Sequence, residues 1–292
     1  MSWNLSAFAD EANEMVDQQI EALQRGGLKF VDLRMVDGVN IAEVPEDLAQ
    51  KTAAKLADAG ITVAMYGSPL GKIDISDDFE IDKAKLNHIG KISSILGAKM
   101  VRIFSYFNRN GASHADWQKV SLERLRELCD IAAKYDLVLY HENEREIYGD
   151  LVADVCVLRD QLRSNYDNFK LIFDFDNFNQ SGEDVWAAWE ELRDATDAIH
   201  LKDSKKQPDG SFQHVPSGQG DGRIKEILAD AAERGFDGPF TLEPHLARSK
   251  AVVATGPHGE SNANLGDLSE MDAFHVAAET AVGLFKSLDR WD

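Results

Sequence analysis

Short apolar segments alternate with longer amphipathic segments along the whole chain. The apolar segments have the length of strands, whereas the amphipathic ones repeat apolar residues at helical spacing. Strands are predicted at Leu5–Ala9, Lys29–Arg34, Thr62–Tyr66, Met100–Phe104, Val138–Glu142, Leu171–Asp174, Ala198–Lys202 and Phe240–Glu243. Helices are predicted at Asp17–Arg25, Pro45–Ala59, Asp82–Leu96, Trp117–Tyr135, Leu151–Asn165, Val185–Ala195, Ile224–Arg234 and Met271–Leu288. Strands that alternate with helices in this way are typical of parallel sheets.

Eight strand and helix pairs in one series predict a (β/α)8 TIM barrel, an α/β fold, rather than an open sheet with fewer strands. The 292 residues suit one such domain, and we expect it to span residues 1–292. No linker rich in Pro, Gly or Ser divides the chain, and Gly256–Ser269 is predicted to be a long loop. No Gly-x-Gly-x-x-Gly motif follows the first strand, so the sequence lacks the main signal of a nucleotide-binding open sheet.

Composition narrows the possible partners. The net charge of −20 argues against nucleic acid, because phosphate binding depends on Lys and Arg. No segment has the roughly 18 apolar residues of a membrane span, and the N-terminus does not resemble a signal peptide. Cys129 and Cys156 fit buried reduced thiols better than a disulfide. We therefore expect a cytoplasmic protein that binds neither nucleic acid nor membrane.

Candidate chemistry lies at the ends of the last four predicted strands. Catalytic groups of such barrels come from the C-terminal strand ends, and side chains two residues apart share one face. This alternation directs Glu142, Asp174, His200 and Glu243 into the barrel. A single acidic residue at a strand end is more often a helix cap or an ion-pair partner. Four such polar residues in register at one end of the barrel instead favour a shared site. Three carboxylates and one imidazole suit one divalent ion, such as Mn²⁺, Mg²⁺, Co²⁺ or Zn²⁺.

Further polar residues near these strand ends are candidates for substrate binding. Lys202 points inward and could donate to a substrate oxygen or pair with Asp174. Arg102 could bind a hydroxyl or phosphate, or form an interior ion pair. His245 is a candidate for substrate contact although it has the opposite alternation phase, while His141 suits packing.

The segment Ser217–Gly222 carries glycines that could bind an anion through backbone amides, although a plain turn is the more common structure. Asp203 could orient a ligand or position Lys202, but capping the following loop is the more common role.

These passages together resemble the sugar phosphate isomerase/epimerase family of the xylose-isomerase-like barrel superfamily, over nearly the whole chain. The residues that carry the resemblance are His141-Glu142-Asn143-Glu144, Phe173-Asp174 with Asn177-Phe178, His200-Leu201-Lys202-Asp203, Val215-Pro216-Ser217-Gly218-Gln219-Gly220-Asp221-Gly222, and Leu242-Glu243-Pro244-His245. The resemblance implies that the quartet binds one metal. It also implies that Glu142 and Glu243 exchange protons on opposite faces of a substrate carbon. Asn177 stands where related ketose 3-epimerases have a histidine, and it is a candidate substrate ligand.

The predicted function is a metal-dependent isomerase or epimerase of a sugar or keto-sugar. A carbon acid next to a carbonyl needs a Lewis acid for the enediolate and a carboxylate base, and this site offers both. The alternative is a metal-dependent lyase or dehydratase of a keto-sugar or keto-cyclitol. An endonuclease-IV-like DNA repair enzyme is disfavoured, because strands three and four lack the additional histidines. A sugar-binding barrel with a structural metal also stays open, as does assembly into a homo-oligomer.

Overall fold

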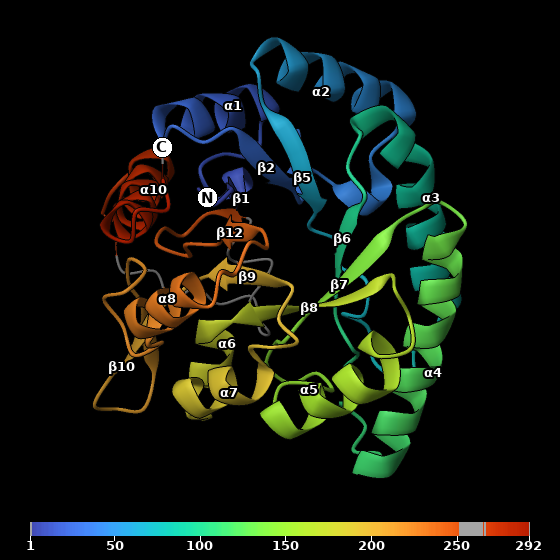
Figure 1. Ribbon diagram of the computed structural model, residues 1–292. Helices are drawn as coiled ribbons and strands as arrows, with labels where there is room; N and C mark the ends of the chain where they lie inside the picture. The colour runs from blue at the N-terminus through green and yellow to red at the C-terminus, as the bar shows by residue number, and fades with distance from the viewer. Residues whose placement is uncertain (1, 251–264, 266, 292) are drawn as a thin grey trace.

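The chain forms a barrel of eight parallel strands with helices around its outside (Figure 1). The computed structural model describes residues 2–250, 265 and 267–291. The strand order is β1, β12, β9, β8, β7, β6, β5 and β2, and every paired neighbour is parallel. β1 and β2 stand at the two ends of this order and lie side by side. The predicted (β/α)8 barrel is confirmed.

The predicted elements agree with the structure to within a few residues. The barrel strands are β1 Leu5–Ala7, β2 Phe30–Leu33, β5 Thr62–Tyr66, β6 Met100–Ile103, β7 Val138–Glu142, β8 Phe169–Asp174, β9 Ala198–Leu201 and β12 Phe240–Leu242. The helices are α1 Val16–Arg25, α2 Glu46–Asp58, α3 Glu80–Leu96, α4 His114–Ala133, α5 Val152–Leu158, η3 Arg159–Arg163, α7 Val185–Leu192, α8 Ile224–Glu233 and α10 Glu270–Ser287. The predicted loop Gly256–Ser269 lies largely outside the described residues.

Several short elements were not predicted. They are the turns η1 Ala9–Glu11 and η2 Ile41–Glu43, the helix α6 Phe175–Gln180, and two hairpins, β3 Met35–Val36 with β4 Val39–Asn40 and β10 Ser204–Lys206 with β11 Phe212–His214. They follow β1, β2, β8 and β9 directly in the chain. All of them therefore extend from the C-terminal ends of barrel strands, where the loops of this fold carry function.

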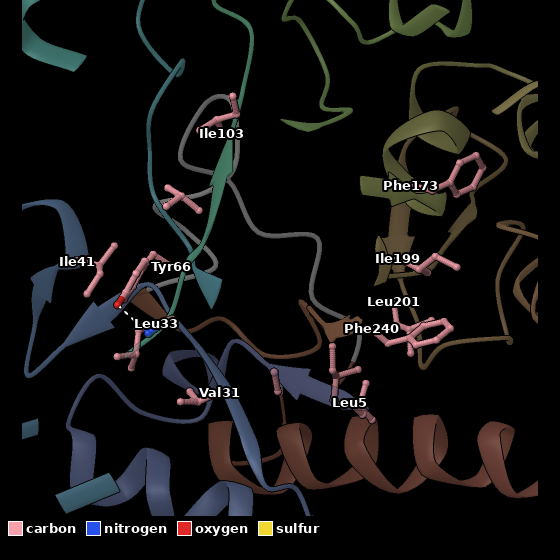
Figure 2. Close-up of a cluster of buried hydrophobic side chains, with 14 of the residues drawn as sticks. Leu5, Val31, Leu33, Ile41, Tyr66, Ile103, Phe173, Ile199, Leu201 and Phe240 are labelled. Carbon is pink, nitrogen blue, oxygen red and sulfur yellow. Dashed lines mark hydrogen bonds between the residues drawn. The ribbon is translucent and has the colours of Figure 1, made fainter. Parts of the chain in front are cut away.

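Two apolar layers fix which side chains face the barrel interior. The larger layer lies between strands and helices and includes Leu5, Ile199 and Phe240 (Figure 2). Phe173 belongs to it, with its ring 5.3 Å from that of Trp189 on α7. The smaller cluster fills the barrel interior with Met65, Ile172 and Ala198, against Met100 and Tyr140. The alternation predicted for β8 and β9 is therefore correct, and it determines which polar residues converge above this interior cluster.

Two further observations concern the whole chain. Among the described residues, no helix is long and apolar enough to cross a membrane. Cys129 and Cys156 are both free thiols; Cys129 is buried, as the sequence predicted, whereas Cys156 is only half-buried.

Candidate metal centre

Four adjacent barrel strands bring the predicted quartet together. Glu142 ends β7, Asp174 ends β8, His200 lies on β9, and Glu243 follows β12. The strands lie in the order β12, β9, β8 and β7, and Asp174 is in register with His200. One ligand atom from each residue lies within 4.8 Å of those from the others, and all four side chains are buried. The two glutamates therefore flank the pair formed by Asp174 and His200.

One oxygen of each carboxylate in the quartet, and both ring nitrogens of the histidine, lack hydrogen-bond partners within the described part of the chain. These atoms are Glu142 Oε2, Asp174 Oδ2, Glu243 Oε2 and both ring nitrogens of His200. His200 Nδ1 is 3.1 Å from Glu142 Oε1 but is not aligned for a hydrogen bond. Arg102 and Lys202 lie within ion-pair distance of two of these oxygens, but buried polar atoms without hydrogen bonds cost stability, so this set around one point favours a further ligand. A divalent cation fits this need, because carboxylate oxygens and imidazole nitrogens are its usual ligands.

The electrostatics of the quartet indicate the same need for positive charge. Burial raises the pKa of Asp174 well above its usual value, against the opposing effect of Lys202. Burial would also raise the pKa of Glu142, but the charges of His200 and Arg102 lower it to about 2. The pKa of His200 rises to about 9, because Glu142 and Glu243 outweigh the effect of burial. Without an added cation, the imidazole thus holds a proton that a metal would replace.

Arg102, Lys202 and Arg34 surround the quartet and pair with its carboxylates. Arg102 Nη1 lies 3.2 Å from Glu142 Oε2, and Lys202 Nζ lies 3.3 Å from Asp174 Oδ2. Arg34 Nη1 lies 3.1 Å from Glu243 Oε1. All three cations are almost completely buried. The ion pairs considered for Lys202 and Arg102 in the sequence are therefore present.

Asn177 lies against Glu142 rather than apart from the quartet. It belongs to α6, whose first turn Asp174 caps by accepting a hydrogen bond from the backbone N–H of Asn177. Its amide nitrogen donates to the carbonyl of Asn143 at 2.8 Å and lies 3.4 Å from Glu142 Oε1. Asn177 thus connects two members of the quartet, Asp174 and Glu142.

The two histidines next to the glutamates lie in different surroundings. His141 is fully buried outside the site, where its Nε2 lies 2.8 Å from Ser105 Oγ and its ring stacks on Phe169. His245, in contrast, turns back to the site, with Nε2 3.4 Å from Glu243 Oε1. Its backbone has a φ of 49°, a left-handed conformation. This conformation explains how a residue on the opposite alternation phase reaches the site.

Several site residues were missed by the sequence reasoning. Asp10 and Glu11 lie on η1, directly after β1, and both contact Arg34, at 2.8 and 3.3 Å. Asp176 and His214 form another buried pair, with Nδ1 of His214 3.2 Å from Asp176 Oδ2. The rule that polar groups gather at strand ends could have identified Asp10 and Glu11. No sequence signal placed His214, because its hairpin was not predicted.

Comparison with known proteins places the fold. The family described as xylose isomerase-like TIM barrel matches residues 20–264. No curated protein sequence matches the chain. Among solved structures, the IOLI protein with a bound zinc atom has a TM-score of 0.72 at 18% identity, covering 98% of this chain and 99% of that chain.

Two further solved structures have the same fold. D-psicose 3-epimerase with D-tagatose from Clostridium cellulolyticum H10 has a TM-score of 0.72 at 15% identity, covering 99% of both chains. The probable 3-DHS dehydratase AsbF involved in petrobactin synthesis from Bacillus anthracis has a TM-score of 0.70 at 16% identity, covering 96% of this chain and 98% of that chain. The family match over most of its length shows that this chain belongs to the xylose isomerase-like TIM barrel family.

Proposed function

We propose that this protein is a metal-dependent isomerase or epimerase of an uncharged sugar or keto-sugar. The observation that carries the proposal is the buried quartet, from which one ligand atom of each residue lies within 4.8 Å of those of the others. Glu142, Asp174, His200 and Glu243 would hold one divalent ion, whose identity among Mn²⁺, Mg²⁺, Co²⁺ and Zn²⁺ the ligand set leaves open. When bound, the ion would supply Lewis acidity at the substrate carbonyl, which acidifies the neighbouring C–H bond.

Glu142 and Glu243 are the proposed catalytic residues. They come from β7 and β12, which β8 and β9 separate in the sheet, so the two carboxylates approach the site from two sides. Such an arrangement lets one carboxylate remove a proton from a substrate carbon and the other return a proton to the opposite face. Inversion at that carbon would be epimerisation. Return of the proton to the adjacent carbon would be aldose–ketose isomerisation.

The proposed substrate-binding residues are Lys202, Arg102, His245 and Asn177. Lys202 and Arg102 would donate hydrogen bonds to substrate oxygens, since both lie against the quartet. His245 presents Nε2 near Glu243 and would contact a hydroxyl group. Asn177 would bind substrate beside Glu142, where its amide already lies.

The charges of the site favour an uncharged substrate. Four cations in or beside the site each have a carboxylate within ion-pair distance: Arg34 with Asp10, Arg102 with Glu142, Lys72 with Glu144, and Lys202 with Asp174. The sequence of residues 251–264 contains no Lys or Arg. A phosphorylated sugar would need a cation that is not already neutralised, since phosphate recognition depends on charge-assisted hydrogen bonds.

A test uses the full chain with Mn²⁺ and a panel of free ketoses in D2O. We expect solvent deuterium at a carbon next to the carbonyl, together with an epimeric or isomeric sugar, by NMR and mass spectrometry. Glu142→Gln and Glu243→Gln should each abolish exchange while the protein stays folded. Retention of full exchange in both variants would refute the roles of the glutamates. Loss of water from the substrate would instead identify a dehydratase, the alternative reaction for this site.

A further inference from the structure

The glycine-rich segment Ser217–Gly222 encloses the carboxylate of Asp203. Oδ2 of Asp203 accepts hydrogen bonds from the backbone N–H groups of Gly218 and Gly220, both at 2.8 Å. Oδ1 accepts a third from Gly222 at 3.0 Å. A Cβ atom on Gly220 would lie 2.4 Å from Oδ1. We call this arrangement the Asp203 clasp; it is an anion-binding loop whose anion belongs to the chain itself.

The Asp203 clasp fixes the base of the β10–β11 hairpin. Asp203 immediately precedes β10, and its carbonyl accepts a hydrogen bond from Val215, immediately after β11. Ser204 pairs with His214 across the hairpin. Asp203 is next to Ser204 at one end of the hairpin, and its carbonyl binds Val215, which is next to His214 at the other end. The clasp therefore helps to fix the position of His214.

His214 contacts two polar residues of the site. Its Nδ1 lies 3.2 Å from Asp176 Oδ2, and its ring meets that of His245 edge to face, with centroids 5.0 Å apart at 88°. The side chain of His245 lies between His214 and Glu243 by these contacts. Asp176 also accepts hydrogen bonds from Ser204 and Gln180, so it is itself held in place. A ring fixed at one end by Asp176 can therefore limit the movement of His245.

His245 is held in a conformation that costs free energy. A left-handed backbone is unfavourable for a residue other than glycine, because its Cβ approaches the following carbonyl oxygen. The backbone N–H of His245 donates to Glu11 Oε2 at 2.7 Å, which holds this conformation. Residues held in costly conformations by several contacts are concentrated at functional sites. The backbone contact with Glu11 and the ring contact with His214 thus restrain His245 from two directions.

We propose that His214 is a positioning residue, which holds the imidazole of His245 against Glu243, and that the Asp203 clasp keeps His214 there. The inference deepens the proposed function, on which it rests for the role of Glu243. Residues that orient a ligand or a catalytic carboxylate typically change activity about 10- to 100-fold when removed.

The first test measures turnover of any sugar that the chain converts. His214→Ala and Asp203→Asn should each lower kcat about 10- to 100-fold, with bound metal unchanged. His214→Asn, which keeps a polar group for Asp176 but no ring, should behave like His214→Ala. Asp209→Asn is the matched control, because this exposed acid lies at the far end of the hairpin, where it accepts hydrogen bonds from Ser211 outside the clasp.

The double variant decides whether the two residues act in one chain of contacts. If Asp203 acts through His214, Asp203→Asn should cause no further loss in the His214→Ala background. The proposal would be overturned if the double variant lost activity by the product of the two single losses, or if His214→Ala kept the wild-type kcat. Should Asp203→Asn fold poorly, Gly220→Ala opens the clasp from the other side, because its Cβ would meet the carboxylate.

A second test needs no substrate. In histidine-labelled full-length chain, the ring signal of His245 is assigned with His245→Gln and followed by NMR, with and without Zn²⁺. The signal should move in His214→Ala and in Asp203→Asn, and it should stay in place in Asp209→Asn. An unmoved signal in the first two variants would overturn the positioning role. A moved signal in a chain that converts no sugar would instead refute the proposed function alone.

Discussion

Arg102 lies between the two proposed catalytic residues, with Nη1 3.2 Å from Glu142 Oε2. The same nitrogen lies 3.6 Å from Glu243 Oε1. One guanidinium thus partly neutralises two buried carboxylates that would otherwise repel each other. It does not complete the site, because Asp174 Oδ2 and Glu243 Oε2 still lack hydrogen-bond partners within the described residues. The site should therefore gain further stability from a cation.

The first prediction concerns the response to metal. A ligand that binds only the folded chain at 100 times its Kd adds about 2.7 kcal/mol to the free energy of unfolding. We expect Mn²⁺ to raise the Tm relative to EDTA, and Asp174→Asn to remove most of this increase. Differential scanning calorimetry provides the measurement. Asp32→Asn is the control, since Asp32 is a buried barrel aspartate that bonds to Thr241 instead. An equal metal response in both variants would contradict the quartet.

The second prediction concerns anions at the edge of the site. Lys72 Nζ lies 2.9 Å from Glu144 Oε2, so its charge is neutralised. Glu144→Gln should release this charge and increase affinity for inorganic phosphate about tenfold, measured by isothermal titration calorimetry. Adding Lys72→Met to Glu144→Gln should remove the gain. Tight phosphate binding by the wild-type chain would argue against an uncharged substrate.

The third prediction concerns pH. Burial raises the pKa of Asp82 from 3.8 to about 6, although Gly71 donates a backbone hydrogen bond to it. Between these pH values the folded chain binds more protons at Asp82 than the unfolded chain does. The free energy of unfolding therefore falls as pH rises, by about 3 kcal/mol from this group.

Asp82→Asn should remove this loss. The variant should gain stability relative to wild type when urea unfolding is compared at pH 7 and at pH 4.5. Asp130→Asn, at an exposed position of α4, is the control and should follow the wild-type pH dependence. An Asp82→Asn variant whose difference from wild type is constant with pH would disprove the raised pKa.

The fourth prediction concerns two glycines with a left-handed backbone, only one of which packs closely against another residue. Gly71 has a φ of 82°, and an added Cβ would lie 2.1 Å from the carbonyl oxygen of Phe104. Gly60 has a φ of 70°, with nothing within 4 Å of its added Cβ. Gly60→Ala should cost about 1 kcal/mol, and Gly71→Ala about 3 kcal/mol or more. Chemical denaturation would measure both, and equal costs would contradict the described packing of Gly71 on Phe104.

The barrel and the quartet could be predicted because both follow from local periodicity. Alternation along β8 and β9 directs Ile172 and Ala198 to the interior cluster, and the same parity directs Asp174 and His200 to the site. The loop contacts could not be predicted in this way. His214 reaches the site through a hairpin and a tertiary contact with Asp176, and neither has a periodic signal.

Other positions depend on backbone geometry that parity does not describe. His245 has the outward phase, but its left-handed backbone returns it to Glu243. The glycines after β11 suggest an anion site, and the group that their amides bind is the carboxylate of Asp203. Only the folded chain shows that this loop already has its ligand.

Arg34 has a consequence for barrel closure as well as for the site. β1 and β2 stand at opposite ends of the order of paired strands, and the barrel closes where they lie side by side. We call this place the seam of the barrel. Arg34 follows β2 directly, and its guanidinium forms two hydrogen bonds with Asp10, just after β1, and one with Glu243, after β12. The same side chain therefore fastens the seam of the barrel and restrains a proposed metal ligand. A variant that loosens the contact between β1 and β2 should therefore also disturb Glu243, so barrel stability and affinity for the proposed metal should fall together.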